Sequence, residues 1–259
     1  MEKIINNYFS GTSGLILPVP NKSYYPEAFR EQSRLCYYGS LMNSIEINSS
    51  FYKIPLGSTM KKWSEDVPQD FKFTFKLFKG ITHNPGLAYD QEDISRFMNV
   101  ISHVGSKQGS ILVQFPPSVR IANYTHLSRL MASLRDHDPG RQWNIALEFR
   151  HQSLYVGEVR ELLQELGFGM VMHDKGIAAS PFDESDLNFR YLRFHGPDGN
   201  YRGSYTEEVL YEYAGYIAEW ITLGKQVFVY FNNTMGAAYE NQQTLKSFVA
   251  DLLNDALGD

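Results

Sequence analysis

The sequence of 259 residues contains only one cysteine, Cys36. A single thiol excludes an intramolecular disulfide and a zinc site built from paired cysteines. The chain also lacks an apolar run long enough to cross a bilayer, and its first residues lack the apolar core of a signal peptide. These absences favour a cytoplasmic protein with no membrane segment.

An excess of positive charge is absent as well, because 24 lysines and arginines stand against 29 aspartates and glutamates. The resulting net charge of −5 argues against a protein that holds nucleic acid by its whole surface. Residues 53–79 depart from this average, with six lysines against three acids. We interpret this run as solvated surface, and a local basic groove is the alternative.

Short runs rich in β-branched and aromatic residues alternate along the chain with segments of helical periodicity. The expected strands lie at 7–14, 43–51, 71–78, 110–118, 144–151, 167–174, 188–196 and 226–234. The expected helices lie at 26–38, 58–66, 90–104, 124–134, 155–166, 206–223 and 240–257.

This alternation with short connections is typical of parallel βα units. Eight such units in roughly 250 residues predict a (β/α)8 TIM-like barrel of the α/β class. No linker or low-complexity segment divides the chain, so we expect a single domain over residues 1–259. An open doubly wound sheet is the alternative, but the G-x-G-x-x-G or Walker loop that would support it does not occur.

Polar side chains stand near the carboxyl ends of the expected strands, where packing alone would place apolar ones. These ends carry the functional site of a (β/α)8 barrel, and unpaired buried charge is costly. Strand six contributes Asp174, or His173 if the alternation is shifted by one residue. The candidate residues of this mouth are Glu46, Asn48, Tyr52, Lys76, Gln114, Glu148, Arg150, Asp174, Arg193, His195, Tyr230, Asn232 and Asn233.

These residue types suit three kinds of chemistry. Glu46 and Glu148 are candidates for acid and base, with His195 as a proton carrier. The lysine and the two arginines of the set suit a clamp for phosphate or carboxylate, since the guanidinium fork matches such anions. Histidine and carboxylate at strand ends are also plausible ligands of a divalent metal, although no spacing here is diagnostic. No motif implies a cofactor.

A structural ring of ion pairs is the alternative that needs no ligand. In that interpretation Glu46 and Glu148 pair with Lys76 and Arg193. Nearby cations would keep both carboxylates ionised, which counts against an acid with a raised pKa. Acidic neighbours would likewise raise the pKa of Lys76, which disfavours a Schiff base at that residue.

The loop after the last expected strand is a further candidate anion site. Asn232 and Asn233 end that strand, and the following helix start is a common phosphate site in such barrels. We expect Gly236, with Ala237 and Ala238, to allow close approach of the backbone to a ligand. The alternative is a plain tight turn.

Nine stretches of the chain together resemble the YecE-like family, known as domain of unknown function 72. They are GTSG (11–14), YYPEAF (24–29), IEINSSFYKIP (45–55), W63 with VPQDFKFTFK (67–76), ITH (81–83), LVQFPPS (112–118), ALEFRHQSL (146–154), YLRFHG (191–196) and VYFNNTMGAAYENQQTL (229–245). The resemblance covers nearly the whole chain and implies a TIM-barrel-like fold, without an established reaction. Leu15 and Leu154 stand where tryptophan is common in the family, which changes the shape of the mouth more than its charges.

We therefore expect a barrel mouth that binds and transforms a small polar anion, such as a sugar phosphate, a nucleotide fragment or a carboxylate. A non-catalytic module for RNA or protein, in which Lys61 and Lys62 matter more than Glu148, is one alternative. A metal-assisted hydrolase is another. The sequence carries no signature of the oligomeric state.

Overall fold

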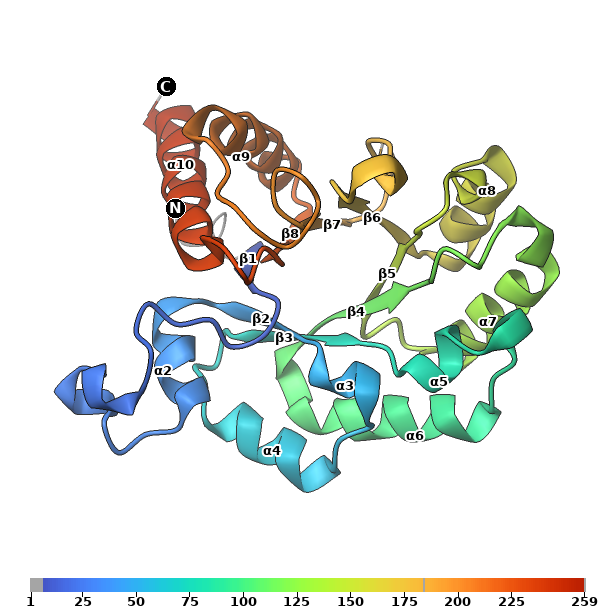
Figure 1. The fold of residues 1–259 in the computed structure, drawn as a ribbon, viewed down its shortest axis with the longest axis horizontal. Coiled ribbons are helices and arrows are strands. Elements are labelled where there is room, and N and C mark those ends of the chain that lie inside the picture. Colours follow the sequence, from blue (N-terminus) through green and yellow to red (C-terminus); the bar gives the residue numbers. More distant parts are fainter. Residues whose placement is uncertain (1–6, 184, 259) are drawn as a thin grey trace.

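Eight parallel strands form the centre of the computed structural model, which describes residues 7–183 and 185–258 (Figure 1). Parallel backbone ladders join them in the order β1-β8-β7-β6-β5-β4-β3-β2. The predicted TIM-like barrel is confirmed. The strands are β1 (Tyr8–Thr12), β2 (Ser44–Ile47), β3 (Lys72–Lys76), β4 (Gln108–Gln114), β5 (Asn144–Glu148), β6 (Gly169–His173), β7 (Phe189–Phe194) and β8 (Gln226–Phe231).

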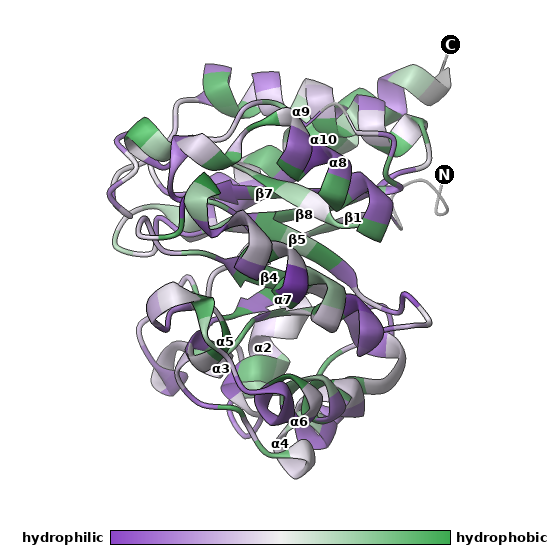
Figure 2. Cartoon of the chain, turned by 90° about the vertical axis from the view of Figure 1, so that its right-hand side faces the viewer, coloured by the Kyte–Doolittle hydropathy of each residue, from purple (hydrophilic) through white to green (hydrophobic). Residues whose placement is uncertain are grey.

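Helices lie around the outside of the strands (Figure 1), and the strands are largely apolar while the helices mix apolar and polar residues (Figure 2). In the helix that spans 91–101, Ile94, Phe97, Met98 and Ile101 form the buried face, as their spacing predicts. The helices are α2 (Arg34–Leu41), α3 (Ser49–Tyr52), α4 (Gly57–Glu65), α5 (Lys79–Thr82), α6 (Gln91–Ile101), α7 (Tyr124–Asp136), α8 (Gly157–Leu166), α9 (Glu207–Thr222) and α10 (Ala238–Gly258), with short 3-10 turns between them.

Several predicted element bounds are wrong, and two of them have a clear local cause. The strand expected to run to residue 51 ends at Ile47, because the Ser50 hydroxyl reaches the carbonyl oxygens of Ile47 (2.9 Å) and Lys76 (2.7 Å) and holds a helical turn there. The helix expected over 26–38 is divided into a 3-10 turn and α2. The helix α2 begins after Ser33, whose side chain accepts a hydrogen bond from the Cys36 backbone.

Side chains, rather than a ladder, close the barrel between β1 and β2 in the described part of the chain. The Tyr38 hydroxyl, from α2, accepts a hydrogen bond from Thr12 N (2.8 Å) and lies 3.1 Å from Ser44 O. Asn43 accepts a hydrogen bond from Ser10 N (2.9 Å). These contacts supply partners that a ladder would otherwise give to the backbone. We call this joint the β1–β2 seam.

The two strands of the β1–β2 seam approach most closely at Gly11. A Cβ atom there would lie 2.0 Å from Ser44 O and 2.6 Å from the Tyr38 hydroxyl, so only glycine fits. Near the mouth the seam has one backbone bridge, between Ser13 and Glu46. The seam therefore leads directly to a glutamate of the predicted site.

The interior of the barrel is layered along its axis. An apolar cluster fills its lower part and is made of Phe9, Leu112, Ala146, Val171, Phe189, Tyr191, Phe228 and Tyr230. The Tyr230 hydroxyl starts a polar layer, with Ser44 Oγ at 2.6 Å and Thr74 Oγ1 at 2.7 Å. The charged residues of the mouth lie beyond this layer. No helix in the described ranges has the length and apolar character of a bilayer span.

Candidate functional site

Arg193, from β7, lies between two fully buried glutamates from β2 and β5. Its Nε and Nη2 each donate to a different carboxylate oxygen of Glu46 at 2.8 Å, and its Nη1 donates to Glu148 Oε2 at 2.5 Å. The arginine itself is 2% exposed. One planar guanidinium therefore joins carboxylates from opposite parts of the barrel.

The carboxylate of Glu46 has a full set of donors. Besides Arg193, it accepts from Ser13 Oγ (2.6 Å), Tyr191 Oη (2.6 Å) and Asn48 Nδ2 (3.3 Å). Burial alone would raise the pKa of Glu46, but the charge of Arg193 and these hydrogen bonds hold that pKa below its usual value. Glu46 is therefore a fixed anion.

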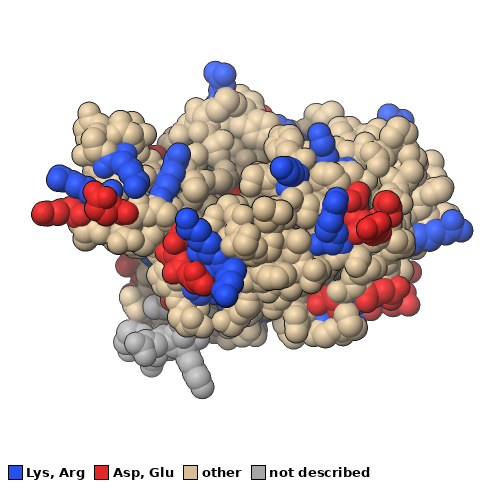
Figure 3. Space-filling view, turned by 90° about the horizontal axis from the view of Figure 1, so that it is seen from below, with Lys and Arg blue, Asp and Glu red and all other residues tan. Residues whose placement is uncertain are grey.

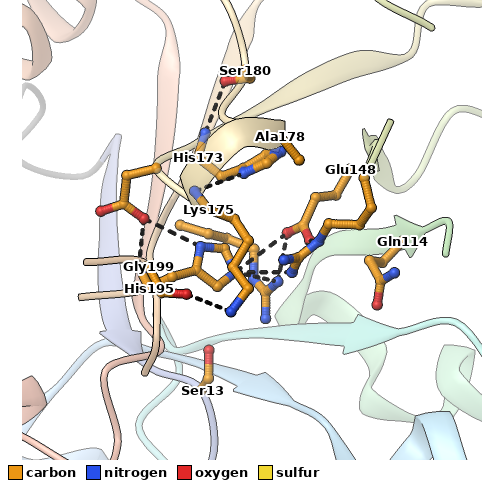
Figure 4. Close-up of polar contacts among 12 residues, drawn as sticks. Ser13, Gln114, Glu148, His173, Lys175, Ala178, Ser180, His195 and Gly199 are labelled. Atoms are coloured by element: carbon orange, nitrogen blue, oxygen red, sulfur yellow. Dashed lines mark hydrogen bonds and ion pairs between the residues drawn. The ribbon is translucent and has the colours of Figure 1, made fainter. Parts of the chain in front are cut away.

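Glu148 is held in the same way by two arginines. Its Oε1 accepts from Arg150 Nε at 2.5 Å, and its Oε2 accepts from Arg193. Burial opposes the negative charge, yet the charges of Arg193 and Arg150 hold the pKa of Glu148 well below its usual range. Figure 4 shows the Glu148 carboxylate and the His195 ring turned toward the same guanidinium groups.

His195 has a fixed tautomer, because its Nε2 faces arginine nitrogens that can only donate. Those atoms are Arg150 Nη2 (3.1 Å) and Arg193 Nη1 (3.3 Å), so Nε2 accepts and the proton is on Nδ1. Nδ1 lies 3.3 Å from Asp174 Oδ1, which also accepts from the His195 backbone at 2.7 Å. Tyr205 in turn donates to the other oxygen of Asp174.

Burial lowers the pKa of His195. The hydrogen bond to Asp174 acts to raise that pKa, but its effect is smaller. The imidazole is thus neutral at pH 7, and both of its nitrogens are bound by protein groups. Its neighbour His173 lies below, where Nε2 is 3.0 Å from Phe149 O. Burial lowers the pKa of His173 to about 4, so this ring is neutral as well.

Lys76, at the end of β3, differs from the other cations of the mouth. Among the described residues its Nζ makes no ion pair or hydrogen bond, and it lies 4.2 Å from the centroid of the Phe51 ring. The alternative of a structural ring paired the two glutamates with Lys76 and Arg193; its Arg193 pairs are present, but its Lys76 pair is wrong, because the arginines occupy the carboxylate oxygens. The predicted rise in its pKa is also wrong, since burial and the charge of Arg193 lower the pKa of Lys76 to about 8.

A cavity of about 230 Å³ opens at this mouth. Among the residues that the structure describes, its wall consists of three cations, three amides and three aromatic rings, with no acid. The structure thereby brings together most of the residues that we predicted to bind a ligand. The lining residues are Asn48, Phe51, Tyr52, Lys76, Gln114, Arg150, Arg193, Tyr201 and Asn232.

The three residues predicted to act as acid, base or proton carrier do not line this cavity. Glu46, Glu148 and His195 are each 0% exposed and lie behind the arginines. Their polar atoms are bound to other protein groups, as described above. Their positions favour a role in holding the arginines, in place of the direct proton transfer that we expected.

Three other predicted ligand-binding residues lie away from the cavity wall. Tyr230 is fully buried in the polar layer below. Asp174 supports the imidazole of His195. Asn233 is also fully buried and donates to Gly203 O at 3.0 Å. These positions do not support the prediction that the three residues contact a ligand.

The predicted anion site at the start of α10 is covered by protein backbone. A Cβ atom on Gly236 would lie 2.3 Å from Gly203 O, and Ala237 N donates to the same oxygen at 3.1 Å. Met235 N donates to Tyr201 O at 3.0 Å. The close approach that we predicted for a ligand is therefore made by the loop after β7.

Four residues of the site were not predicted from the sequence. Tyr191 lies two residues before Arg193 on β7, and this alternation is a signal that could have identified it. Ser13 lies in the GTSG stretch (11–14) and Phe51 in the IEINSSFYKIP stretch (45–55), but neither was predicted to be a site residue. Tyr201 comes from an irregular loop and has a positive φ of 69°, for which the sequence offers no signal.

The structure offers little support for two alternatives, the metal-assisted hydrolase and the module that binds RNA or protein through a basic surface. Among the described residues no group of three or more His, Cys, Asp or Glu side chains could hold a metal ion. Figure 3 shows the molecule from below, where α4 lies; lysines and arginines alternate there with acids and do not merge into one basic field. Such a mixed surface does not resemble a nucleic-acid footprint.

Comparison with known proteins places this geometry among relatives that share the barrel. A model of the family described as "Protein of unknown function DUF72" matches residues 9–256. The UPF0759 protein YunF of Bacillus subtilis is 28% identical over 263 residues, which cover 86% of this chain and 89% of YunF. A crystal structure of a DUF72 family protein from Enterococcus faecalis is 20% identical with a TM-score of 0.76, covering 94% of this chain and 95% of that one. A DUF72 family protein from Thermotoga maritima is 23% identical with a TM-score of 0.68, covering 95% and 99%.

Proposed function

Because this chain belongs to the DUF72 family, whose description names no activity, we propose a function from the geometry of its mouth: it binds a small anionic metabolite there. The observation that carries this proposal is the charge of the cavity wall. Lys76, Arg150 and Arg193 line the cavity, and no acid of the described ranges 7–183 and 185–258 does. The two glutamates of the ring stand behind the arginines.

Within the described part of the chain, the balance of charge in the ring leaves one cation without an ion-pair partner. Three cations share two glutamates, and both glutamates are bound by the arginines. A small anion beside Lys76 would complete the balance and offset the cost of a half-buried ammonium group. Phosphate and carboxylate also suit the Arg150 guanidinium group, whose Nη1 makes no hydrogen bond among the described residues, while its Nε and Nη2 contact Glu148 and His195.

Other parts of the wall indicate what else the anion carries. Asn48 donates to Glu46, while its buried Oδ1 has no hydrogen-bond partner among the described residues. An unpaired buried acceptor favours a ligand with a hydroxyl or amine donor. Three aromatic rings complete the wall, and a volume of about 230 Å³ fits a small molecule or the head group of a larger one. A sugar phosphate and a hydroxy acid both satisfy these requirements.

The glutamates act as positioning residues in this proposal. Glu46 and Glu148 fix the plane of Arg193 through three hydrogen bonds, so little side-chain freedom is lost when an anion arrives. They also keep the neighbouring cations from repelling one another. Their ionised state makes them poor proton donors at neutral pH.

The test is binding of a panel of anions, followed by calorimetry and by thermal shift. The panel contains inorganic phosphate, small sugar phosphates, hydroxy acids and the matching uncharged sugars. We expect charged members to bind and Lys76→Met to weaken them by about tenfold or more, which is one charge-assisted contact. The control is Lys62→Met, which removes an exposed lysine of α4 and should bind as the wild type does. Binding that is lost in Lys62→Met but kept in Lys76→Met would instead favour the basic-surface alternative.

A further inference from the structure

The amine of Lys76 stands apart from the other lysines that are shielded from water. Lys72, Lys107 and Lys225 each donate to a backbone carbonyl oxygen, at 2.8, 2.7 and 2.7 Å respectively. Lys76 Nζ has no such contact among the described residues. Lys76 lines the cavity, and its Nζ lies next to the Phe51 ring. Its lone pair is therefore available whenever the amine is deprotonated.

The surroundings of Lys76 favour that deprotonated form. Burial and the Arg193 guanidinium lower the pKa of the amine to about 8, and both glutamates that could stabilise an ammonium group are bound to arginines. At pH 7 roughly a tenth of the amine is then neutral, far more than for an ordinary lysine. Burial and neighbouring cations are conditions that activate a lysine side chain as a nucleophile, because both favour its neutral amine.

We propose that Lys76 forms an iminium with the aldehyde or ketone group of a small anionic metabolite, whose phosphate or carboxylate contacts Arg150 and Arg193. The inference rests on the proposed anion-binding function and names the substrate class within it. The three residues line the same cavity of about 230 Å³. A molecule of three or four carbons with a terminal anion can therefore contact both kinds of group at once.

The step is balanced without any further reactant. The amine nitrogen bonds to the carbonyl carbon, the carbon–oxygen bond breaks, and the oxygen leaves as water with two of the three ammonium protons. The iminium keeps the single positive charge, so the charge of the cavity does not change. The centroid of the Phe51 ring lies 4.2 Å from Nζ, and the face of this ring suits either cation, the ammonium group or the iminium.

The test is reductive trapping with cyanoborohydride at pH 7.5, followed by intact mass and peptide mapping. The probes are pyruvate, glyoxylate and dihydroxyacetone phosphate, with acetone and dihydroxyacetone as uncharged counterparts. We expect one adduct per chain, on Lys76, formed at least about tenfold faster with the anionic probes because of the arginines. Lys76→Arg should form none, and Lys62→Arg should react as the wild type does.

Binding of inorganic phosphate, measured by calorimetry on the same samples, separates the two proposals. Phosphate binding by wild type and by Lys76→Arg, together with no adduct on Lys76, would overturn the iminium and leave the anion site standing. Absence of both phosphate binding and adduct would overturn both. Adducts spread over surface lysines, with equal rates for charged and uncharged probes, would also contradict the inference.

Discussion

Two cations of the mouth, Arg193 and Lys76, have opposite effects on stability at the scale of single residues. Arg193→Met leaves Glu46 and Glu148 buried without their shared partner, so we expect it to cost about 3–5 kcal/mol of unfolding free energy. Lys76→Met removes a desolvated amine with no ion pair and should be neutral or stabilising. Urea unfolding of the two variants at pH 7 measures the difference, and equal losses would contradict this assignment of partners.

The titration of Lys76 gives a second prediction for this residue. Its pKa is about 8 in the folded protein, against 10.5 for the ordinary side chain. Between these values the unfolded chain holds more protons, so the contribution of Lys76 makes stability rise with pH, by at most about 1.4 kcal/mol per pH unit. The difference between wild type and Lys76→Met, followed by urea unfolding from pH 7.5 to 10.5, isolates this slope. A flat difference would contradict the lowered pKa.

The same titration also predicts the pH dependence of binding. Anions should bind more weakly as the pH rises through about 8, because the ammonium form is lost. Calorimetry with inorganic phosphate, at pH values where its own charge is constant, measures the effect. Lys76→Arg serves as the control and should show no decline over that range, since a guanidinium stays charged.

Individual site residues were predictable where the alternation of a strand fixed their direction. Glu148 and Arg193 occupy strand ends, and the rule that side chains alternate was enough to find them. The partners were not predictable, because the choice between Lys76 and Arg150 for Glu148 depends on side-chain reach and on guanidinium geometry. The error about the pKa of Lys76 followed from that wrong choice of partner.

At the scale of elements, the Tyr38 hydroxyl group contacts the backbone of both strands at the β1–β2 seam. Tyr38→Phe removes the acceptor for Thr12 N and leaves buried backbone groups without partners, which we expect to cost about 1–3 kcal/mol. Hydrogen exchange at Thr12 should accelerate more than exchange in β5. Tyr37→Phe on the same helix removes a hydroxyl that takes no part in the seam, and it should leave the rate at Thr12 unchanged.

Periodicity predicted the existence of each strand and of the longer helices, because apolar spacing of two or of 3.6 residues determines which face is buried. It did not predict the helical turn at residues 48–52, where the Ser50 hydroxyl is within hydrogen-bond distance of carbonyl oxygens from two strands. Such a contact joins positions 26 residues apart. The local sequence of β2 therefore predicts a strand that continues past Ile47. The same error is expected wherever a side chain ends a strand or helix by contacting a residue far away in the sequence.

At the scale of the whole molecule, buried neutral histidines predict loss of stability in mild acid. The pKa of His173 is lowered to about 4, below the ordinary 6.5, so the unfolded chain binds more protons between these values. Its contribution is complete above pH 6.5 and is lost as the pH falls toward 4. Urea unfolding over this range should show a smaller decline in His173→Gln than in wild type. The exposed His126 provides the control, since His126→Gln should keep the wild-type slope.

The β1–β2 seam has a consequence for how the width of this barrel can evolve. Seven joints are backbone ladders, whose spacing does not depend on the identity of side chains. The spacing at the eighth depends on Gly11, Tyr38 and Asn43. We expect substitutions of these residues to change the separation of Ser13 from Glu46, while the seven ladders preserve the strand order. The width of the mouth is thus tied, through the contact between Ser13 and Glu46, to the hydrogen bonds that keep Glu46 ionised.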